Sequence, residues 1–438
     1  MDTVSFEPTK QLFIDVLTKD ISIHDCVLDL ADNSVDSYVW HKLSQRRTIQ
    51  LGFGKDEFHV YDDCGGIPAK KVREEVFRFG FSDLKARRST IGFYGIGLKR
   101  AVFKIAREIR FETDDGNKYT RVDINVHDWA EKEHEWTWPL HPSSGKSKLK
   151  KAEKPYTKIV MSDLTDEAKE TFDVAFINDL KETIGIYYTR FIQNKITFMV
   201  DKEKIGPFDL GIKYSKEYPP ANHIEEYEGV KIHITCWIQP WEGRRTEKER
   251  GRQGWNIFMN DRLVIHDDAS PKTGWSGDEG QLPKMHSIFN QFRGLVLLES
   301  KDPSKLPINT LKNDFHTENV VYKHLLSEMI HAARPLVNFL SKKYGRADEI
   351  EAKAVQTAMG SEGQSEIETV SIDKLTKNRD FKVTSTPKAN DGLVMIRYWK
   401  PKEQVELVKN YLKITKNPDV GVKTFDYFVK VEGLENEK

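Results

Sequence analysis

Apolar residues recur at helical spacing from about Thr9 to Tyr38, which predicts a helix near the start of the chain. Four polar residues form a stripe along this helix, at steps of four, four and three: Asp25, Asp29, Asn33 and Asp36. Such a stripe is most often a solvated helix face. Here Cys26, Leu28 and Ala31 make much of the remaining circumference apolar, so we expect the helix to be largely buried. Buried carboxylates need partners, and cations are suitable ones.

Two strand-like runs, Thr48–Phe53 and Glu57–Tyr61, follow the helix and are joined through a short polar turn, which predicts a hairpin. The second run leads directly into Asp62-Asp-Cys-Gly-Gly-Ile-Pro68. Adjacent glycines after a strand mark a tight turn or a place where a ligand approaches the backbone. The ordinary interpretation is a turn without a ligand, but a carboxylate at the strand end can also accept a hydrogen bond from an exocyclic amine.

A glycine-rich segment stands before the next helical run: Gly92, Gly95 and Gly97 precede Leu98, Ala101, Val102 and Ile105. Residues without Cβ let successive N–H groups face an anion, and the N-terminus of a helix adds the positive end of its dipole. Phosphate is the natural occupant of such a segment. It is not a Walker A loop, because no Gly-Lys-Ser/Thr follows, and it lacks the βαβ context of a dinucleotide-binding fingerprint. The polar and basic segment 79–90 before it is expected to be a mobile lid.

The rest of the chain divides into a strand-rich part and a polar tail. The pattern predicts these elements: strands between Arg107 and Ser162 with a turn at Asp114–Asn117, a helix over Thr171–Asn194, strands over Lys195–Val200, Val230–Trp237, Trp255–Met259, Arg262–His266 and Gly294–Leu298, a helix over Val320–Tyr344, a strand over Leu393–Trp399, a helix over Pro401–Leu412 and an element over Val420–Val429. We expect four regions, 1–200, 201–345, 346–389 and 390–438, of which the third is a polar linker.

Composition narrows the class of protein. With 438 residues, the chain is long enough for two cores or more. Lys and Arg number 68, as do Asp and Glu, so net charge gives no reason to expect attraction to nucleic acid or to a membrane. The basic cluster at 244–252 is interrupted by Glu247 and Glu249 and reads as a solvated loop, with contact to nucleic acid as the alternative.

Three distant cysteines, no signal-like N-terminus and no long apolar window predict a cytoplasmic protein without a membrane span.

The order of the first three motifs resembles that of the GHKL ATPases, which include gyrase, Hsp90, histidine kinases, MutL and the MORC group. An acidic helix with an asparagine is followed by Asp-x-x-x-Gly after a strand and then by a Gly-x-x-Gly-x-Gly-Leu-Lys segment. The resemblance is nearest to prokaryotic Hsp90-like or MORC-like ATP-binding proteins. It implies an α+β fold: a Bergerat-type sandwich, a mixed sheet covered by helices, over residues 1–200, then an S5-like transducer domain over 201–345 and a small C-terminal region.

The resemblance also implies the ligands and the residues that hold them. ATP and Mg²⁺ would be bound, with Asn33 at the metal, Asp29 at the position of the general base and Asp62 at the adenine amino group. The further nucleotide contacts would be Gly66, Ile67, Gly92, Gly95, Ile96, Gly97, Leu98, Lys99 and Thr157. A lysine of the transducer domain reaches the γ-phosphate in such enzymes, and Lys312, in a loop rich in proline and asparagine, is the residue at that place here.

Some positions depart from the family pattern. Asp29 stands where topoisomerases and MutL have glutamate, one methylene longer, which implies slow hydrolysis. Cys64 replaces a glycine of the usual turn, and Tyr156 stands where glycine is common. The implied function is an ATPase that dimerises on binding ATP and acts on nucleic acid or a partner protein, such as a nuclease or helicase of a prokaryotic anti-phage defence or restriction system. The alternatives are an Hsp90-like chaperone and a nucleotide-binding scaffold without turnover.

Overall fold

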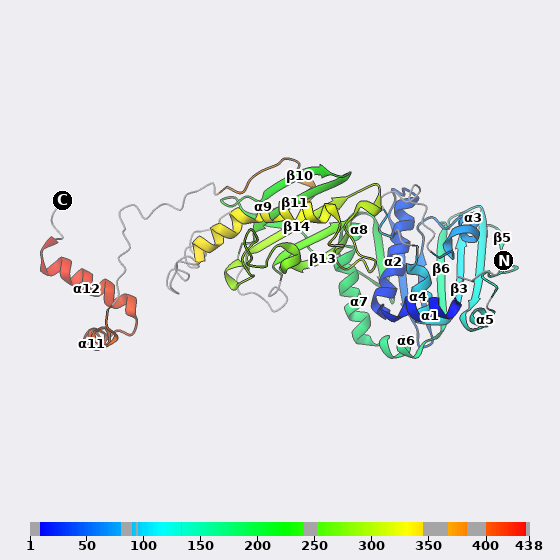
Figure 1. The fold of residues 1–438 in the computed structure, drawn as a ribbon, viewed down its shortest axis with the longest axis horizontal. Helices are drawn as coiled ribbons and strands as arrows, with labels where there is room; N and C mark the ends of the chain where they lie inside the picture. The colour runs from blue at the N-terminus through cyan, green and yellow to red at the C-terminus, as the bar shows by residue number, and fades with distance from the viewer. Residues whose placement is uncertain are drawn as a thin grey trace, which may run out of the picture. The chain divides into compact units, whose positions relative to one another are not determined.

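The computed structural model describes residues 9–79, 90–92, 95–132, 134–240, 252–344, 367–382 and 400–434. The chain forms two compact units, Met1–Thr384 and Ser385–Lys438 (Figure 1). Most of the predicted lid at 79–90, most of the basic cluster at 244–252, and the predicted strand at 393–399 lie outside the described residues.

Two helices, not one, open the first unit. The predicted helix from Thr9 to Tyr38 is wrong in this respect, because the structure has α1 (Lys10–Lys19) and α2 (Ile23–Trp40). The division falls where Ser22 accepts a hydrogen bond from the N–H of Asp25, and a serine in this position starts a new helix. α2 is buried along most of its length, as its apolar circumference predicts.

The first sheet is mixed. Its strands, among the described residues, are β1 (Arg47–Phe53), β2 (Glu57–Asp62), β3 (Ala106–Asp114), β4 (Lys118–Asn125), β5 (Gly145–Lys146), β6 (Tyr156–Leu164), β7 (Ile196–Val200) and β8 (Glu203–Lys204). They lie in the order β5-β4-β3-β6-β2-β1-β7-β8, with β1 parallel to β7 and the other neighbours antiparallel. Buried and less buried residues alternate along β2, so one face of the sheet carries the core.

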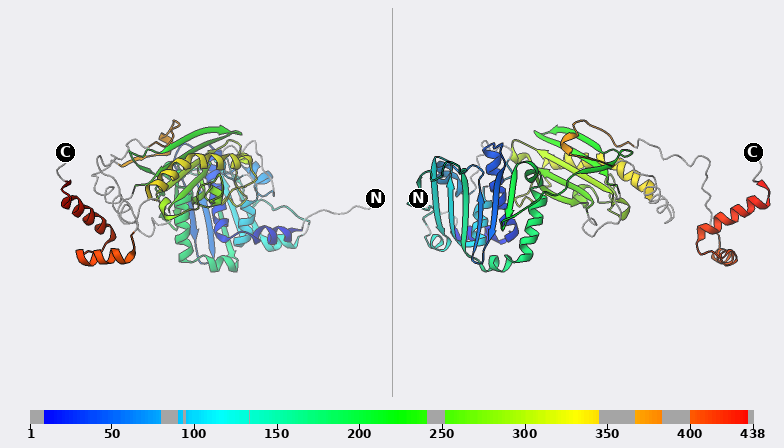
Figure 2. Two further views of the ribbon diagram at one scale, coloured as in Figure 1. Left: turned by 60° about the vertical axis from the view of Figure 1, so that its left-hand side comes forward. Right: turned by 180° about the vertical axis from the view of Figure 1, so that it is seen from behind.

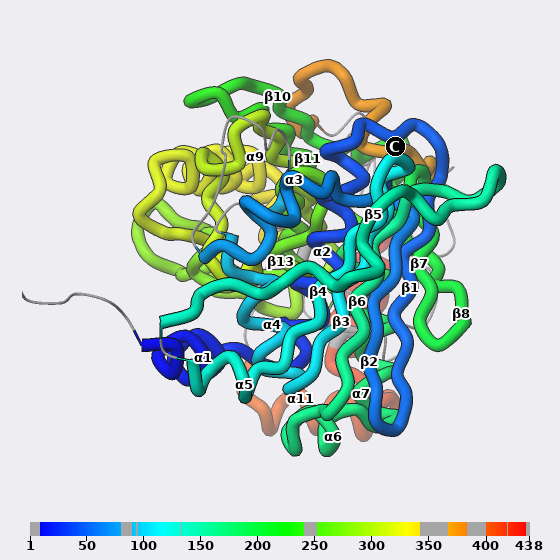
Figure 3. The backbone as a smooth tube through the Cα atoms, turned by 90° about the vertical axis from the view of Figure 1, so that its right-hand side faces the viewer, coloured from blue at the N-terminus to red at the C-terminus, as the bar shows by residue number. Residues whose placement is uncertain are grey.

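Helices cover that face. The helices of this part, besides α1 and α2, are α3 (Ala69–Lys71), a π turn (Val72–Val76), α4 (Gly97–Ile105), α5 (Val126–Glu131), α6 (Asp166–Thr171), α7 (Val174–Tyr187) and α8 (Thr189–Asn194). α2 packs against α4, and Figure 3 shows α1, α2 and α4 on the same side of the strands. The single helix predicted over Thr171–Asn194 is wrong, because Asp173 caps the start of α7 and Tyr188 leaves helical geometry between α7 and α8.

The second sheet contains β10 (Ala221–Tyr227), β11 (Val230–Ile238), β12 (Gly254–Met259), β13 (Arg262–Asp268) and β14 (Phe292–Glu299). The described strands lie in the order β10-β11-β14-β12-β13, with β12 parallel to β14. Helix α9 (Val320–Tyr344) runs along one face of this sheet (Figures 1 and 2) and buries Leu325, Met329 and Leu336 in a second core. A separate pair of strands joins β9 (Ile212–Ser215) to β15 (Ile367–Val370).

The hairpin β12–β13 meets the first sheet's helices through its tip. Asn260 and Asp261 both have positive φ, at 48° and 67°, as a two-residue hairpin turn requires. Asp261 receives Nε of Arg190 and Nζ of Lys195, both at 2.7 Å, and Asn260 donates to the carbonyl of Thr90 at 3.1 Å. The tip therefore ties the second sheet to α8 and to the segment before α4.

In the second unit the described residues form α11 (Lys402–Leu412) and α12 (Asn417–Val431). The predicted helix over Pro401–Leu412 is confirmed, and the predicted element over Val420–Val429 is part of α12.

The α+β prediction, with a mixed sheet covered by helices, is confirmed, whereas the four predicted region boundaries stay predictions. Within the described ranges, helices are too short or too polar to span a membrane. The three cysteines, Cys26, Cys64 and Cys236, are buried and free.

Candidate functional site

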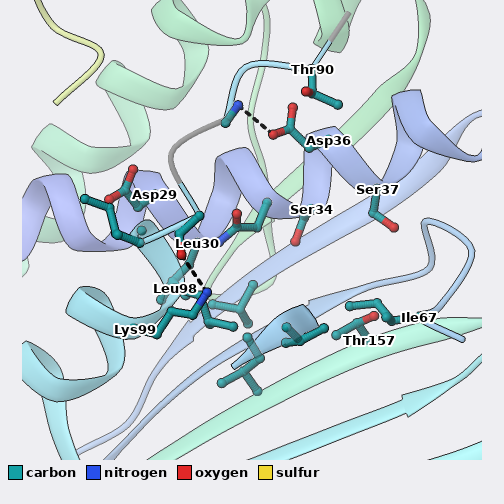
Figure 4. Close-up of a pocket in the computed structure, with 18 of the residues that line it drawn as sticks. Asp29, Leu30, Ser34, Asp36, Ser37, Ile67, Thr90, Leu98, Lys99 and Thr157 are labelled. Carbon is teal, nitrogen blue, oxygen red and sulfur yellow. Dashed lines mark hydrogen bonds between the residues drawn. The ribbon is translucent and has the colours of Figure 1, made fainter. Parts of the chain in front are cut away.

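A cavity of about 1360 Å³, including its open mouth, lies between α2, the ends of β2 and β6, and the start of α4. Figure 4 shows Ser34 and Asp36 along α2, across the cavity from Thr157. Every position predicted above for nucleotide, metal or catalysis lies in the wall: Asp29, Asn33, Asp62, Gly66, Ile67, Gly92, Gly95, Ile96, Gly97, Leu98, Lys99, Thr157 and Lys312. The structure thus brings these residues together, while their individual roles stay predictions.

A buried carboxylate lies at the end of β2. Asp62 is 4% exposed, and it accepts hydrogen bonds from the hydroxyl of Ser34 and the N–H of Cys64, both at 2.9 Å. Burial raises the pKa of Asp62 to about 7, although these two hydrogen bonds act in the opposite direction. An acceptor of this kind suits a ligand N–H donor such as an exocyclic amine, because the donor would offset part of the cost of burying the charge.

The pKa of Asp62 leads to a prediction about stability. An unfolded aspartate has a pKa of about 3.9, so between about pH 4 and 7 the folded chain holds a proton that the unfolded chain has released. The stability that the protonated form of Asp62 contributes is therefore fully present below about pH 4 and is lost as pH rises through about 7. We expect the melting temperature of Asp62→Asn to fall less, or rise more, than that of the wild type across this range in differential scanning fluorimetry. Parallel curves for the two proteins would contradict the assignment.

The turn after β2 requires its glycines. A Cβ on Gly66, whose φ is 68°, would lie 2.3 Å from the carbonyl oxygen of Asp114. The next residue, Ile67, donates its N–H to Oγ1 of Thr113 at 2.7 Å, and that hydroxyl lies 3.2 Å from Oγ1 of Thr157. The turn is thus held against β3 and β6, and its residues Gly66 and Ile67 line the cavity.

The glycine-rich segment lies close against α2. Asp36 accepts the N–H groups of Ile91 and Gly92 at 2.7 and 2.8 Å, and desolvation raises its pKa to about 6 despite these bonds. A Cβ on Gly97 would lie 3.2 Å from the carboxyl group of Asp29, so glycine permits this approach. α4 begins at Gly97, and the N–H groups of a first helical turn have no partner inside the helix, which makes this end suited to an anion.

Asp29 does not stand free in the cavity wall. Its Oδ2 accepts Nε and Nη2 of Arg100 at 2.8 and 2.6 Å, and its Oδ1 accepts Nζ of Lys312 at 2.9 Å. The cation partner expected for the acidic stripe is therefore supplied, at Asp29, by two side chains of the protein. The other stripe residues differ: Asp36 holds backbone N–H groups, and Asp25 lies outside the cavity wall, near the helix start.

Lys312 comes from the segment that follows the second sheet, and its φ of 58° is left-handed. Its Nζ also donates to Oδ2 of Asp32 at 2.8 Å, while Oδ1 of Asp32 accepts Nε of Arg262 at 2.8 Å and the hydroxyl of Tyr188 at 2.7 Å. Burial alone would raise the pKa of Asp32, but Arg262 and Lys312 hold it below its usual value. Burial would lower the pKa of Lys312, but Asp29 and Asp32 hold it well above its usual value. Asp32 and Lys312 therefore both stay charged at neutral pH.

Sequence reasoning missed three charged members of this network, and Tyr188 as well. Asp32 is completely buried, with 0% of its surface exposed. It does not belong to the polar stripe that the helical period marks on α2. Arg100 follows the glycine segment without a signal of its own, and Arg262 is marked by the sequence only as the first residue of a predicted strand. Arg262 also donates to the carbonyl of Lys312 at 2.8 Å, so it holds both the lysine's backbone and the lysine's partner. Pairs 71, 230 and 283 residues apart in the chain cannot be read from spacing.

The residues in the wall fit a magnesium nucleotide. Asn33 is exposed within the wall on the same helix as Asp29 and Asp36, and amide and carboxylate oxygens suit Mg²⁺. The acceptor at Asp62 and the helix start at Gly97 both line this cavity, as a ligand with an amine and phosphates requires.

Residues 21–157 match the model of the family described as histidine kinase-, DNA gyrase B- and HSP90-like ATPases. This part of the chain is therefore similar to the GHKL-type ATPases, as its three ordered motifs predict, and the match supports ATP binding in the cavity. The match ends within β6, so the second sheet and Lys312 lie beyond it. No curated protein matches the chain.

Proposed function

We propose that the chain binds Mg²⁺ and ATP, hydrolyses the nucleotide slowly, and passes the state of the nucleotide to its second sheet through Lys312. One observation carries the proposal. The ammonium group of Lys312, which follows the second sheet in the chain, lies in the wall of the GHKL-type cavity, 2.9 Å from Asp29 and 2.8 Å from Asp32. A γ-phosphate is an alternative anionic partner for this ammonium group.

The two oxygens of Asp29 have separate partners, which suggests how turnover depends on Lys312. Arg100 binds Oδ2 and fixes the orientation of the carboxylate, whereas Lys312 occupies Oδ1. When Lys312 turns to the γ-phosphate, Oδ1 becomes free to accept a proton from the attacking water. Asn33 would hold Mg²⁺, which when bound neutralises part of the phosphate charge. Losing the γ-phosphate would return Lys312 to Asp29 and Asp32, and the second sheet would return with it to the arrangement that it has without nucleotide.

A second candidate is a nucleotide-binding scaffold without turnover. The observation that favours it is that Asp29, already one methylene shorter than glutamate, is held by two cations. In that case Arg100 and Lys312 would stay paired with Asp29 whether or not ATP is bound. The site would then respond to the binding of nucleotide but would not hydrolyse it. The two candidates differ in a single measurable quantity, the release of phosphate.

We further propose that ATP binding drives dimerisation, and that the dimer acts on nucleic acid or on a partner protein, with anti-phage defence or restriction as the setting. The family resemblance supports this proposal, as it does the alternative of an Hsp90-like chaperone. Gel shift on duplex DNA at two salt concentrations separates them, because contact with the phosphate backbone weakens steeply as salt increases. Suppression of client aggregation without any shift would favour the chaperone.

The proposal as a whole is tested with Lys312→Ala. We expect the wild type to release phosphate from ATP and to increase in mass with a non-hydrolysable analogue, measured by light scattering. The variant should bind the analogue but neither turn over ATP nor change mass, because the charge that senses the γ-phosphate is missing. Lys305→Ala, in the same segment but outside the cavity wall, is the control and should behave as the wild type. A wild type that neither binds ATP nor changes mass overturns the switch.

A further inference from the structure

A group of histidines and glutamates lies at the edge of the second sheet, apart from the nucleotide cavity. His223 and Glu225 belong to the edge strand β10 and, two residues apart, point to the same face. They pair with Ile234 and Ile232 of β11, which are core residues under α9. Helix α9 contacts β10 and supplies His324 and Glu328, one turn apart, to the same place.

The distances in this group are those of a metal site rather than of hydrogen bonds. Nε2 of His223 lies 3.5 Å from Oε2 of Glu225 and 3.8 Å from Oε2 of Glu328. Two ligands of a tetrahedral zinc ion, each about 2.1 Å from it, are separated by about 3.4 Å. One ligand atom from each of the three residues lies within 4.8 Å of the others. An ion can therefore be placed between them with small side-chain movements.

The imidazole of His223 supplies an independent observation. Its Nε2 is shielded from solvent and has no hydrogen-bond partner among the residues that the structure describes. Leaving such a nitrogen without a partner is destabilising. It faces two carboxylates at distances that suit a shared cation, and a cation would satisfy its lone pair.

His324 is placed to orient one of the three ligands rather than to bind the ion itself. Its Nε2–H donates to Oε1 of Glu225 at 2.7 Å, which leaves Oε2 of the same carboxylate facing His223. The ring of His324 stacks on Tyr227 with centroids 3.9 Å apart, so its orientation is fixed. Groups that orient a ligand in this way raise metal affinity by about 10- to 100-fold.

We propose that His223, Glu225 and Glu328 bind a divalent transition-metal ion of the zinc type. One imidazole with two carboxylates suits Zn²⁺ or Co²⁺, whereas Ca²⁺ and Mg²⁺ prefer oxygen ligands alone. Three protein ligands leave the fourth position of a tetrahedral ion for water or for a group of a partner. The three side chains are 36%, 26% and 26% exposed, so solvent can reach this position. The ion joins the edge strand to α9 and so stiffens the second sheet.

The experiment uses the untagged full chain, stripped with a chelator and titrated with Co²⁺ and with Zn²⁺. We expect one equivalent of Co²⁺ to bind with visible absorption of low coordination number and without thiolate charge transfer, which excludes the three cysteines as ligands. The double variant His223→Ala/Glu328→Gln should lose this equivalent. His324→Ala should keep it with an affinity about 10- to 100-fold lower. Zn²⁺ should raise the melting temperature of the wild type and not that of the double variant.

A matched control uses the exposed pair His127 and Glu131 on α5, whose Nε2 and Oε1 lie 3.8 Å apart. Among the described residues, this pair is not part of a group of three metal-binding side chains. His127→Ala/Glu131→Gln should bind one equivalent as the wild type does. Circular dichroism shows whether each variant is folded before titration. The proposal is overturned if the wild type binds no Co²⁺ or Zn²⁺, if a folded double variant binds as tightly as the wild type, or if Mg²⁺ competes with Zn²⁺ at equal concentration. None of these readouts depends on ATP turnover.

Discussion

Asp29→Asn is expected to lower kcat for ATP hydrolysis by about 10²- to 10⁴-fold, the usual contribution of a general base. The amide keeps the shape of the side chain but cannot take the proton of the attacking water. Binding of a non-hydrolysable analogue should change little, because Asp32 and the carbonyl of Thr310 still hold Lys312 and Arg100 in place before the nucleotide binds. Both quantities are measurable on one preparation, by phosphate release and by calorimetry.

The control for this experiment is Asp25→Asn, one helical turn earlier on α2. Asp25 lies outside the cavity wall and accepts the hydroxyl of Ser22. Its replacement should leave kcat unchanged, since its side chain binds Ser22 at the start of α2 and does not line the cavity. If Asp29→Asn hydrolyses ATP as fast as the wild type, Asp29 is a structural ion-pair residue and another group activates the water. If the wild type itself releases no phosphate while binding ATP, the scaffold without turnover is the better description.

Arg262→Ala should destabilise the first unit by about 3–5 kcal/mol, the range for a buried ion pair that loses one partner. Arg262 and Asp32 are 2% and 0% exposed, so water cannot replace the guanidinium group. The same change frees the carbonyl of Lys312, which Arg262 holds at 2.8 Å, and so loosens the segment that carries the lysine into the cavity. Denaturation followed by tryptophan fluorescence measures the loss.

Lys323→Ala is the matched control, because Lys323 lies at an exposed position of α9, where its Nζ pairs with Oε2 of Glu318 at 3.0 Å. Exposed pairs contribute less than about 1 kcal/mol, so this variant should unfold as the wild type does. Equal stability of Arg262→Ala and Lys323→Ala would show that the buried network does not hold the two sheets together. Arg262→Lys separates charge from geometry, since lysine keeps the charge but cannot contact Asp32 and the carbonyl of Lys312 with one planar group.

Local patterns were sufficient for most individual elements. Alternation along Glu57–Tyr61 and the polar turn before it predicted a hairpin, and the structure has β1 and β2 in that arrangement. Where the prediction was wrong, the error was in joining helices: Ser22 and Asp173 act as caps that start new helices inside stretches with continuous helical period. A cap depends on one side chain and one N–H group, so apolar spacing does not reveal it.

The sequence by itself determined which residues are available for a nucleotide: the order of the acidic helix, the Asp62 turn and the glycine segment was enough to indicate a GHKL-type ATPase domain, and residues 21–157 match that family. Only the tertiary structure decided how Asp29 is held. The contacts of its two oxygens with Arg100 and Lys312 join residues 71 and 283 positions apart, and such contacts arise from how the sheets and helices pack. Periodicity reports the face of one element, whereas the partner of a buried charge is set by whichever element covers that face.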